Sequence, residues 1–170
     1  MKKLDSIDYK ILFELMKNSR RSDRQLAKTL KTSQPTVTRR RIKLEKNFIE
    51  GYTVLPRWEK IDFELVAFTF VKTKIRYAKS EERERAIRKA REWFMKQPNV
   101  VFAIGGHGMG WDGVCISLHK SYSDFAEFIR KHDSELSDVI SESQSFIADM
   151  HPVTIIKSLH FKYLAKATEK

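Results

Sequence analysis

The sequence predicts an α+β fold in which an N-terminal unit of three helices precedes a β-α-β-β-α-β domain. Two patterns carry this prediction. Apolar residues recur every three or four positions through roughly the first 45 residues, whereas strand-like apolar runs alternate with two helical segments after residue 63. At 170 residues, with 41% hydrophobic and 32% charged residues, the chain can bury a core in one or two small domains.

The first two predicted helices are amphipathic. The first has an apolar stripe of Leu4, Ile7, Ile11, Leu12, Leu15 and Met16. Asp5 and Asp8 stand in its first turn, where carboxylates interact favourably with the positive end of the helix dipole. The second helix lies within residues 22–30, where Leu26, Ala27 and Leu30 form the apolar stripe. Both helices therefore have one face for a shared core.

The third predicted helix follows a short turn and begins with strong start signals. Ser33 is typical of an N-cap, and Pro35 falls in the first turn, where its missing N–H donor costs nothing. Val37, Ile42 and Leu44 are expected to face the core. The residues left outward are Thr36, Thr38, Arg39, Arg40 and Lys43. A helix that exposes hydroxyl and guanidinium groups in this way suits the DNA major groove.

The charge distribution agrees with a nucleic-acid partner. Residues 20–46 hold 10 Lys/Arg and 2 Asp/Glu, a net charge of +8, whereas residues 61–170 hold 17 and 15. A basic surplus confined to one segment is the pattern expected for binding a polyanion, although a solvated basic face would give the same count. Together with the capped helix, it predicts a helix-turn-helix that binds double-stranded DNA.

The predicted DNA contacts fall into two groups. Arginine can donate two hydrogen bonds to guanine, glutamine can pair with adenine, and threonine can contact a phosphate or a thymine methyl. Base-edge or adjacent phosphate contacts are therefore expected from Arg39, Arg40, Thr36, Thr38 and Gln34, beside the capping Ser33. Phosphate contacts are expected from Arg21, Arg24, Lys28 and Lys43.

A wing and a linker are predicted after the third helix. Residues 48–56 alternate in polarity and contain Gly51, which indicates a strand or tight hairpin, so the N-terminal unit is expected to be a winged helix-turn-helix. The domain boundaries that follow are 1–52 for the DNA-binding domain, 53–62 for a linker strand and 63–170 for the second domain.

The second domain is predicted to be ferredoxin-like. Strands are expected at 65–74, 100–104, 113–118 and 141–150, with an extra C-terminal strand at 153–163. Helices are expected at 80–97, capped by Ser80 and buried through Ile87, Ala90 and Phe94, and at 122–132. The strand at 65–71 is apolar on both faces, which favours burial against helices on one side and a partner sheet on the other. Residues 62–163 are therefore expected to form a homodimer or a larger even-numbered oligomer.

Three segments carry a family resemblance. LDSIDYKIL at 4–12, SQPTVTRR at 33–40 and FIEGY at 48–52 occur in the order found in the Lrp/AsnC, or feast/famine, transcriptional regulators, which the chain resembles over nearly its whole length. The resemblance implies a winged helix-turn-helix followed by a ferredoxin-like domain that oligomerises and senses a small molecule.

The glycine-rich segment 105–112 has two interpretations. A phosphate loop is disfavoured because no Lys-Ser or Lys-Thr follows and the next element is strand-like; a β-hairpin connection is favoured. The family resemblance implies an amino-acid effector near this loop, at a subunit interface. It points to Gly108, Trp111, Asp112, Ser143 and Ser145 as effector-binding residues, although the two serines could equally be exposed strand residues.

Other chemistries are disfavoured. The five histidines lack metal-ligand spacing and are expected at the surface or in caps, so no metal or cofactor is predicted, and no catalytic triad can be assembled. Cys115 is expected to be a small buried residue. The longest apolar runs are too short to span a bilayer and no signal peptide is evident, which predicts a cytoplasmic protein without a membrane partner.

The leading hypothesis is a sequence-specific DNA-binding transcriptional regulator, not an enzyme. One alternative is an architectural, chromatin-like DNA-binding protein. A less favoured alternative is a tetrapyrrole (siroheme) decarboxylase of the same two-domain plan, whose chemistry needs basic and histidine residues clustered in the second domain. The charge surplus lies in the first domain instead.

Overall fold

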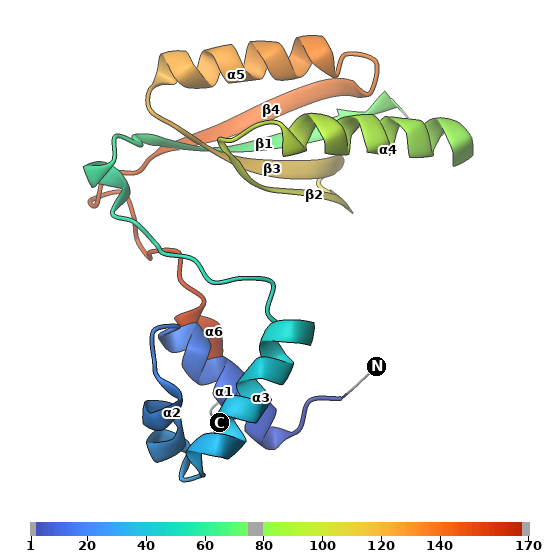
Figure 1. The fold of residues 1–170 in the computed structure, drawn as a ribbon. Coiled ribbons are helices and arrows are strands. Elements are labelled where there is room, and N and C mark those ends of the chain that lie inside the picture. The colour runs from blue at the N-terminus through green and yellow to red at the C-terminus, as the bar shows by residue number, and fades with distance from the viewer. Residues whose placement is uncertain (1–2, 75–79, 168–170) are drawn as a thin grey trace. The chain divides into compact units, whose positions relative to one another are not determined.

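A computed structural model describes residues 3–74 and 80–167 and divides the chain into two compact units. Unit 1 holds the residues up to Leu55 together with those from Lys157 onward, and unit 2 holds Pro56–Ile156 (Figure 1). The predicted domain boundaries at 52 and 63 bracket this division, but the C-terminal residues group with the first unit rather than the second.

Unit 1 is helical, and its helices begin where the sequence provides caps. The helices are α1 (Ser6–Lys17), α2 (Asp23–Leu30), α3 (Gln34–Asn47) and α6 (Lys162–Ala167). Asp5 caps α1 and forms a reciprocal capping box with Asp8, and Ser22 does the same for α2 with Gln25. Each box satisfies two backbone donors that the first helical turn leaves open. The helix start predicted at Ser33 is confirmed, and α2 lies within the predicted range 22–30.

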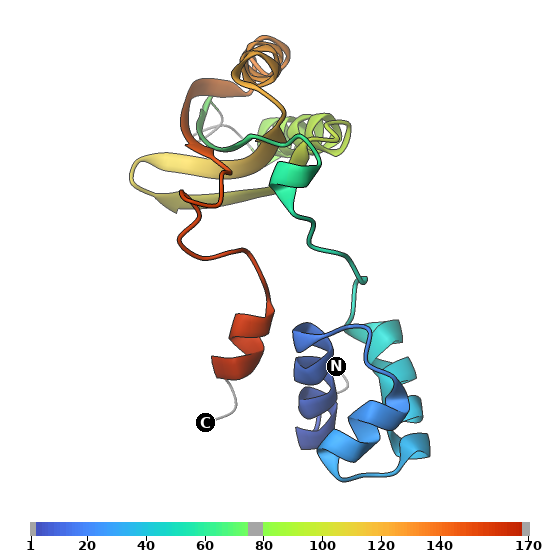
Figure 2. The ribbon, with the colours of Figure 1, turned by 90° about the vertical axis from the view of Figure 1, so that its left-hand side faces the viewer.

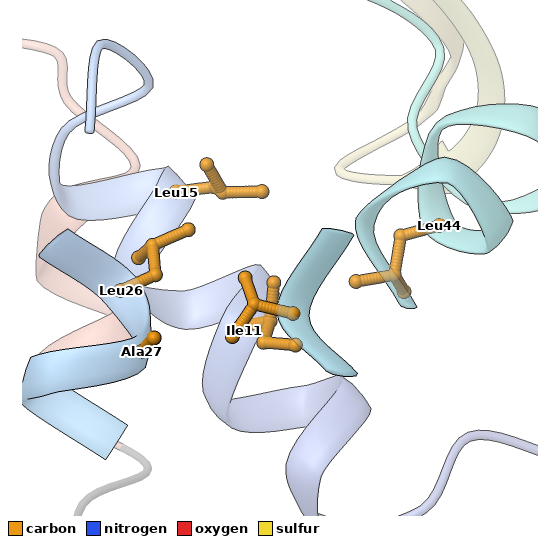
Figure 3. Packing of buried hydrophobic residues seen from close by; sticks show 6 residues of the cluster. Ile11, Leu15, Leu26, Ala27 and Leu44 are labelled. Carbon is orange, nitrogen blue, oxygen red and sulfur yellow. The ribbon is translucent and has the colours of Figure 1, made fainter. Parts of the chain in front are cut away.

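The core of unit 1 is the predicted meeting of three apolar stripes. Buried side chains from α1, α2 and α3 come together (Figure 3): Ile11, Leu15, Leu26, Ala27, Val37 and Leu44. The expectation for Ile42 was wrong, since its side chain is 59% exposed. Val37 and Leu44 lie seven positions apart on one stripe, whereas Ile42 is rotated well away from it.

Unit 2 is a four-stranded antiparallel sheet with the strand order β2-β3-β1-β4, which confirms the ferredoxin-like prediction. Its strands are β1 (Leu65–Thr73), β2 (Val100–Gly108), β3 (Trp111–His119) and β4 (Ile140–Asp149). The helices α4 (Ser80–Met95) and α5 (Tyr122–Glu135) lie on the same face of the sheet (Figures 1 and 2). Among the residues that the structure describes, no helix of unit 2 covers the other face of the sheet.

The covered face of the sheet holds the core of unit 2. Trp93 of α4 packs against Phe128, and the indole nitrogen donates to Glu135 at 2.7 Å. The predicted α4 stripe was wrong at Ile87, which is 45% exposed, and missed the buried Trp93, whereas Phe94 packs against this core as expected. Ser80 is the first helical residue, and the position before it lies outside the described residues.

Two histidines contradict the surface assignment. His119 and His132 are fully buried; His119 contacts Ser117 at 2.8 Å, and His132 contacts Asp133 at 2.8 Å. The prediction for Cys115 is confirmed: this residue is 1% exposed, and burial raises the pKa of its thiol to about 11. That pKa excludes a reactive thiolate at neutral pH.

Two predicted strands do not form. Within the described chain, residues 49–57 contain neither a strand nor a hairpin, so unit 1 has no wing, and a short 3₁₀ helix, η1 (Trp58–Lys60), follows. Residues 153–163 also form no strand. The Thr154 hydroxyl donates to the carbonyls of Asp149 and His151, which turns the chain away after β4. The chain then reaches α6, which packs against α1 and buries Ala165.

Candidate DNA interface and effector cleft

The start of α3 is held by hydroxyl groups. The Ser33 Oγ accepts from the backbone N–H of Thr36 at 3.3 Å and contacts the Thr36 Oγ1 at 2.7 Å. Pro35 lies in the first turn, as predicted. Because Ser33 and Thr36 bond to each other, their hydroxyls fix the helix start and stand at its exposed end.

The inner side of α3 is tied to α1 through one buried carboxylate. Asp8 is fully buried, and it accepts from Arg40 at 2.8 Å and from Lys43 at 2.6 Å. Arg40 also pairs with Asp5. Burial alone would raise the pKa of Asp8, but the hydrogen bonds from Lys43 and Arg40 prevail and hold it below its ordinary value. Arg40 and Lys43, expected to point outward, therefore serve the packing of α1 on α3.

A second carboxylate joins α2 to α3. Asp23 accepts from the Thr38 hydroxyl at 2.6 Å and from Arg41 at 3.2 Å. Arg41 also donates to the Arg21 carbonyl and to Glu45. Burial would lower the pKa of Arg41, yet its hydrogen bonds with Glu45 and Asp23 outweigh that effect and raise it. No role was predicted for Arg41 from the sequence.

The other residues predicted to contact DNA differ in whether they already form ion pairs within unit 1. Arg21 is ion-paired with Glu14 of α1, so its positive charge is partly neutralised within unit 1. Arg24, Lys28, Gln34 and Arg39 are exposed, and within the described chain none of the three cations among them makes an ion pair. A shallow hollow on the outer side of α3 is lined by Gln34, Pro35, Thr38, Arg39 and Ile42. Arg39 and Ile42 on this side of α3 are exposed.

The five predicted effector residues do not converge on one point of the protomer. The Asp112 carboxylate accepts from the backbone N–H and the hydroxyl of Thr73, at 2.9 and 3.1 Å. Trp111 instead contacts Phe70, and the Lys72 ammonium group lies over the Trp111 ring. Gly108 lies at the end of β2, beside the tight turn in which Met109 and Gly110 have positive φ angles. This turn confirms the hairpin interpretation of the loop.

The two serines have partners on the helix-covered side of the sheet. Ser143 donates to Asp133 of α5 at 2.8 Å, and the Ser145 hydroxyl contacts the Thr69 hydroxyl at 2.8 Å. Both serines lie on β4, and Asp112 lies on β3, with β1 between these two strands. The serines are therefore part of the packing of β4 rather than of the surroundings of Asp112.

A cleft of about 760 Å³ does contain Asp112. It runs between α4 and the β2–β3 hairpin and includes the glycines Gly105 and Gly106. Its apolar wall comes from residues such as Phe94 and Ile87 of α4, and its other polar groups besides Asp112 include Arg83, Arg91 and the imidazole of His107. The cleft thus offers an anion, cations and an apolar wall within one space. Arg83 and Arg91 lie one helical turn before and after Ile87 on the cleft side of α4, and sequence reasoning considered only the apolar residues of that stripe.

Two further observations concern the described residues only. In the part of the chain that the structure covers, no group of three or more His, Cys, Asp or Glu residues is placed to hold a metal ion. No helix among those residues is long and apolar enough to cross a membrane.

Comparison with known proteins decides the family. Residues 4–45 match the model of the AsnC-type helix-turn-helix domain, which covers α1, α2 and most of α3. An HTH-type transcriptional regulator of Pyrococcus abyssi, itself uncharacterised, is 33% identical over 128 residues, or 75% of this chain and 80% of the relative. The chain belongs to the Lrp/AsnC family of transcriptional regulators. It is accordingly a DNA-binding regulator, and its relatives are regulators rather than enzymes.

Solved structures of Lrp/AsnC regulators share both units. A transcriptional regulator of Neisseria meningitidis in complex with L-Met superposes with a TM-score of 0.74 at 25% identity, covering 95% of this chain and 99% of that one. LrpC of B. subtilis superposes with a TM-score of 0.68 at 26% identity, covering 86% and 95%. The Lrp/AsnC assignment therefore extends over the sheet domain as well as the helices.

Proposed function

We propose that this Lrp/AsnC regulator reads specific DNA sites with the outer side of α3. One observation carries the proposal: the basic residues of α3 are divided between two tasks. Arg40, Arg41 and Lys43 are held by carboxylates of unit 1, whereas Arg39 stays exposed beside Gln34 on the opposite side. Arg39 can form a bidentate pair with guanine, and Gln34 can pair with adenine. Arg24 and Lys28 on α2 are the proposed phosphate contacts.

Selection of bound fragments from a random DNA pool by the full chain tests this proposal. A sharp palindromic consensus is expected, because a two-fold dimer presents two recognition helices to two half-sites. Smooth enrichment of A·T-rich fragments would favour the architectural alternative instead. No enrichment at all would remove the DNA-binding role and revive the decarboxylase alternative. We also propose a cytoplasmic location, because a regulator of this kind acts in the compartment that holds the DNA.

A homodimer is the proposed binding unit, with the uncovered sheet face as its interface. The strand register places Phe102, Ile116, Phe68 and Phe146 in one row across all four strands. Phe146 is 64% exposed and Phe102 50%, and Phe68 contacts Phe146 with ring centroids 6.3 Å apart. An antiparallel sheet that faces water normally carries polar residues there, so an apolar row favours a second sheet packed against it. Higher even-numbered assemblies could be built from such dimers.

An amino-acid effector is the proposed ligand of the α4 cleft. Asp112 can accept the ammonium group, and Arg83 or Arg91 can pair with the carboxylate. Phe94 and Ile87 offer an apolar wall for the ligand side chain. The L-Met found with the Neisseria relative supports this class of ligand. Binding there would alter DNA affinity through its effect on assembly.

A thermal-shift screen of the common amino acids tests the effector. A hit at millimolar concentration should disappear in Asp112→Asn, which loses the negative charge but can still accept from Thr73. Ser143→Ala is the matched control and should keep the hit, because Ser143 is bonded to Asp133 and not to the cleft. No shift with any amino acid would leave a regulator that responds to its own concentration alone.

A further inference from the structure

Ile42 is an apolar side chain on the outer side of a strongly basic helix. It is 59% exposed, whereas Val37 and Leu44 of the same helix are fully buried. A single exposed isoleucine is ordinary on protein surfaces and would mean little elsewhere. Its neighbours give it meaning, because it lines the same hollow as Gln34 and Arg39, the two proposed base-reading residues.

The spacing of these residues places them on one helical stripe. Pro35, Arg39 and Ile42 are separated by four and three positions, so their side chains lie one above the other on the helix surface. The neighbouring cations point elsewhere: Arg40 and Lys43 pair with Asp8, and Arg41 pairs with Asp23. Ile42 therefore continues the stripe that faces DNA into the third turn of α3.

We infer that Ile42 reads the 5-methyl group of a thymine in each half-site. This inference rests on the proposed function, since it requires α3 to lie in the major groove. The thymine methyl is the apolar group among the base edges displayed there, and an aliphatic side chain recognises it by excluding water. The β-branched side chain of isoleucine is restricted to one main χ1 rotamer in a helix, so little conformational freedom is lost on contact.

The position of this thymine relative to the other contacts follows from helix geometry. Ile42 lies three residues beyond Arg39, or about 4.5 Å along the helix axis, and successive bases on one strand are about 3.4 Å apart. The thymine is therefore expected about one or two base pairs from the guanine that Arg39 contacts.

Replacing single thymines by deoxyuridine tests the inference, because deoxyuridine lacks only the methyl group. The full chain is titrated onto the selected palindrome with each thymine replaced in turn. At one thymine position of each half-site, a single replacement should weaken binding about four-fold, which is the effect of removing one buried methyl group. Replacements at the other thymines should leave the affinity unchanged. In Ile42→Ala, thymine and deoxyuridine should bind equally well at that position. Ile156→Ala, which truncates a fully exposed isoleucine outside α3, is the control and should keep the wild-type profile.

The results separate this inference from the proposed function. If Ile42→Ala weakens binding to every sequence equally and keeps the deoxyuridine penalty, Ile42 contacts the sugar-phosphate backbone and the inference is wrong. If the pool yields no consensus, the proposed function fails, and the thymine contact fails with it. Because Ile42 is exposed, Ile42→Ala should unfold at the wild-type temperature, and a circular-dichroism melt checks this.

Discussion

The two units of this chain differ in where their apolar side chains lie. Unit 1 gathers its buried apolar side chains into one core and displays charge, whereas unit 2 covers one face of its sheet and leaves Phe102 and Phe146 exposed on the other. We therefore expect unit 1 to bind DNA through its charged surface and unit 2 to pack against a second apolar surface. The comparison predicts that DNA reading and assembly are separate properties, located in different units and open to separate disruption.

The largest expected effect comes from placing a charge on the uncovered sheet face. Phe146→Asp puts a carboxylate on β4 within the proposed dimer interface, where it would be buried without a partner. We expect a monomer by light scattering at micromolar concentration. Val153→Asp is the control, since this 85% exposed residue lies outside the sheet, and it should stay dimeric. A dimer that survives Phe146→Asp would place assembly elsewhere.

The next effect concerns the carboxylate that joins α1 to α3. Asp8→Asn should lower the free energy of unfolding by about 2–3 kcal/mol, because Arg40 and Lys43 lose a buried ionic partner. The matched control is Asp138→Asn, which breaks an exposed pair with Lys89 in unit 2 and should cost under about 1 kcal/mol. Urea denaturation measures both. Equal losses would show that the Asp8 network adds nothing beyond a surface pair.

A smaller effect should separate base contacts from phosphate contacts. Arg39→Ala should lose about 1–3 kcal/mol at one base position and relax the preference there, since the guanidinium is the proposed guanine reader. Lys28→Ala should weaken all sequences alike and reduce the salt slope by about one unit. Binding isotherms at several salt concentrations distinguish the two variants. Identical specificity profiles would contradict the assignment.

The smallest effect is a pH dependence expected of unit 2. Burial lowers the pKa of His119 in the folded state, whereas the unfolded chain keeps the ordinary value near 6.5. The unfolded state therefore binds the proton first as pH falls, so stability present above pH ~6.5 declines below it, by at most about 1.4 kcal/mol per pH unit. Denaturation at pH 7.5 and 5.5 measures the decline. His119→Gln should reduce it, and an unchanged decline would assign it to other groups.

Local signals in the sequence predicted the helices and the sheet well. The N-cap signal at Ser33 predicted the start of α3, and the apolar stripes predicted most of the core of unit 1. Alternation alone misled at 153–163, because side-chain hydroxyl bonds at Thr154 turn the chain after β4. Gly51 likewise suggested a turn, but its backbone does not take a positive φ.

Ion pairs and hydrogen bonds between residues far apart in the sequence could not be predicted from local patterns. Arg40 lies 32 positions from Asp8 and Thr38 lies 15 from Asp23, and nothing in the local spacing links these residues. Arg40 was consequently expected to point to DNA. The exposure of Ile42, by contrast, had a readable signal, since its position falls off the Val37–Leu44 stripe and onto that of Arg39.

The separation of DNA reading from assembly is tested most directly by the ratio of two affinities, that for a full palindrome and that for one isolated half-site. In wild type, the second half-site should strengthen binding by about 100-fold or more, because dimerisation makes the second contact intramolecular. In Phe146→Asp, the half-site affinity should stay at the wild-type value, while the gain from the second half-site disappears. A variant that keeps the full gain, or that loses half-site binding as well, would contradict the separation of reading from assembly.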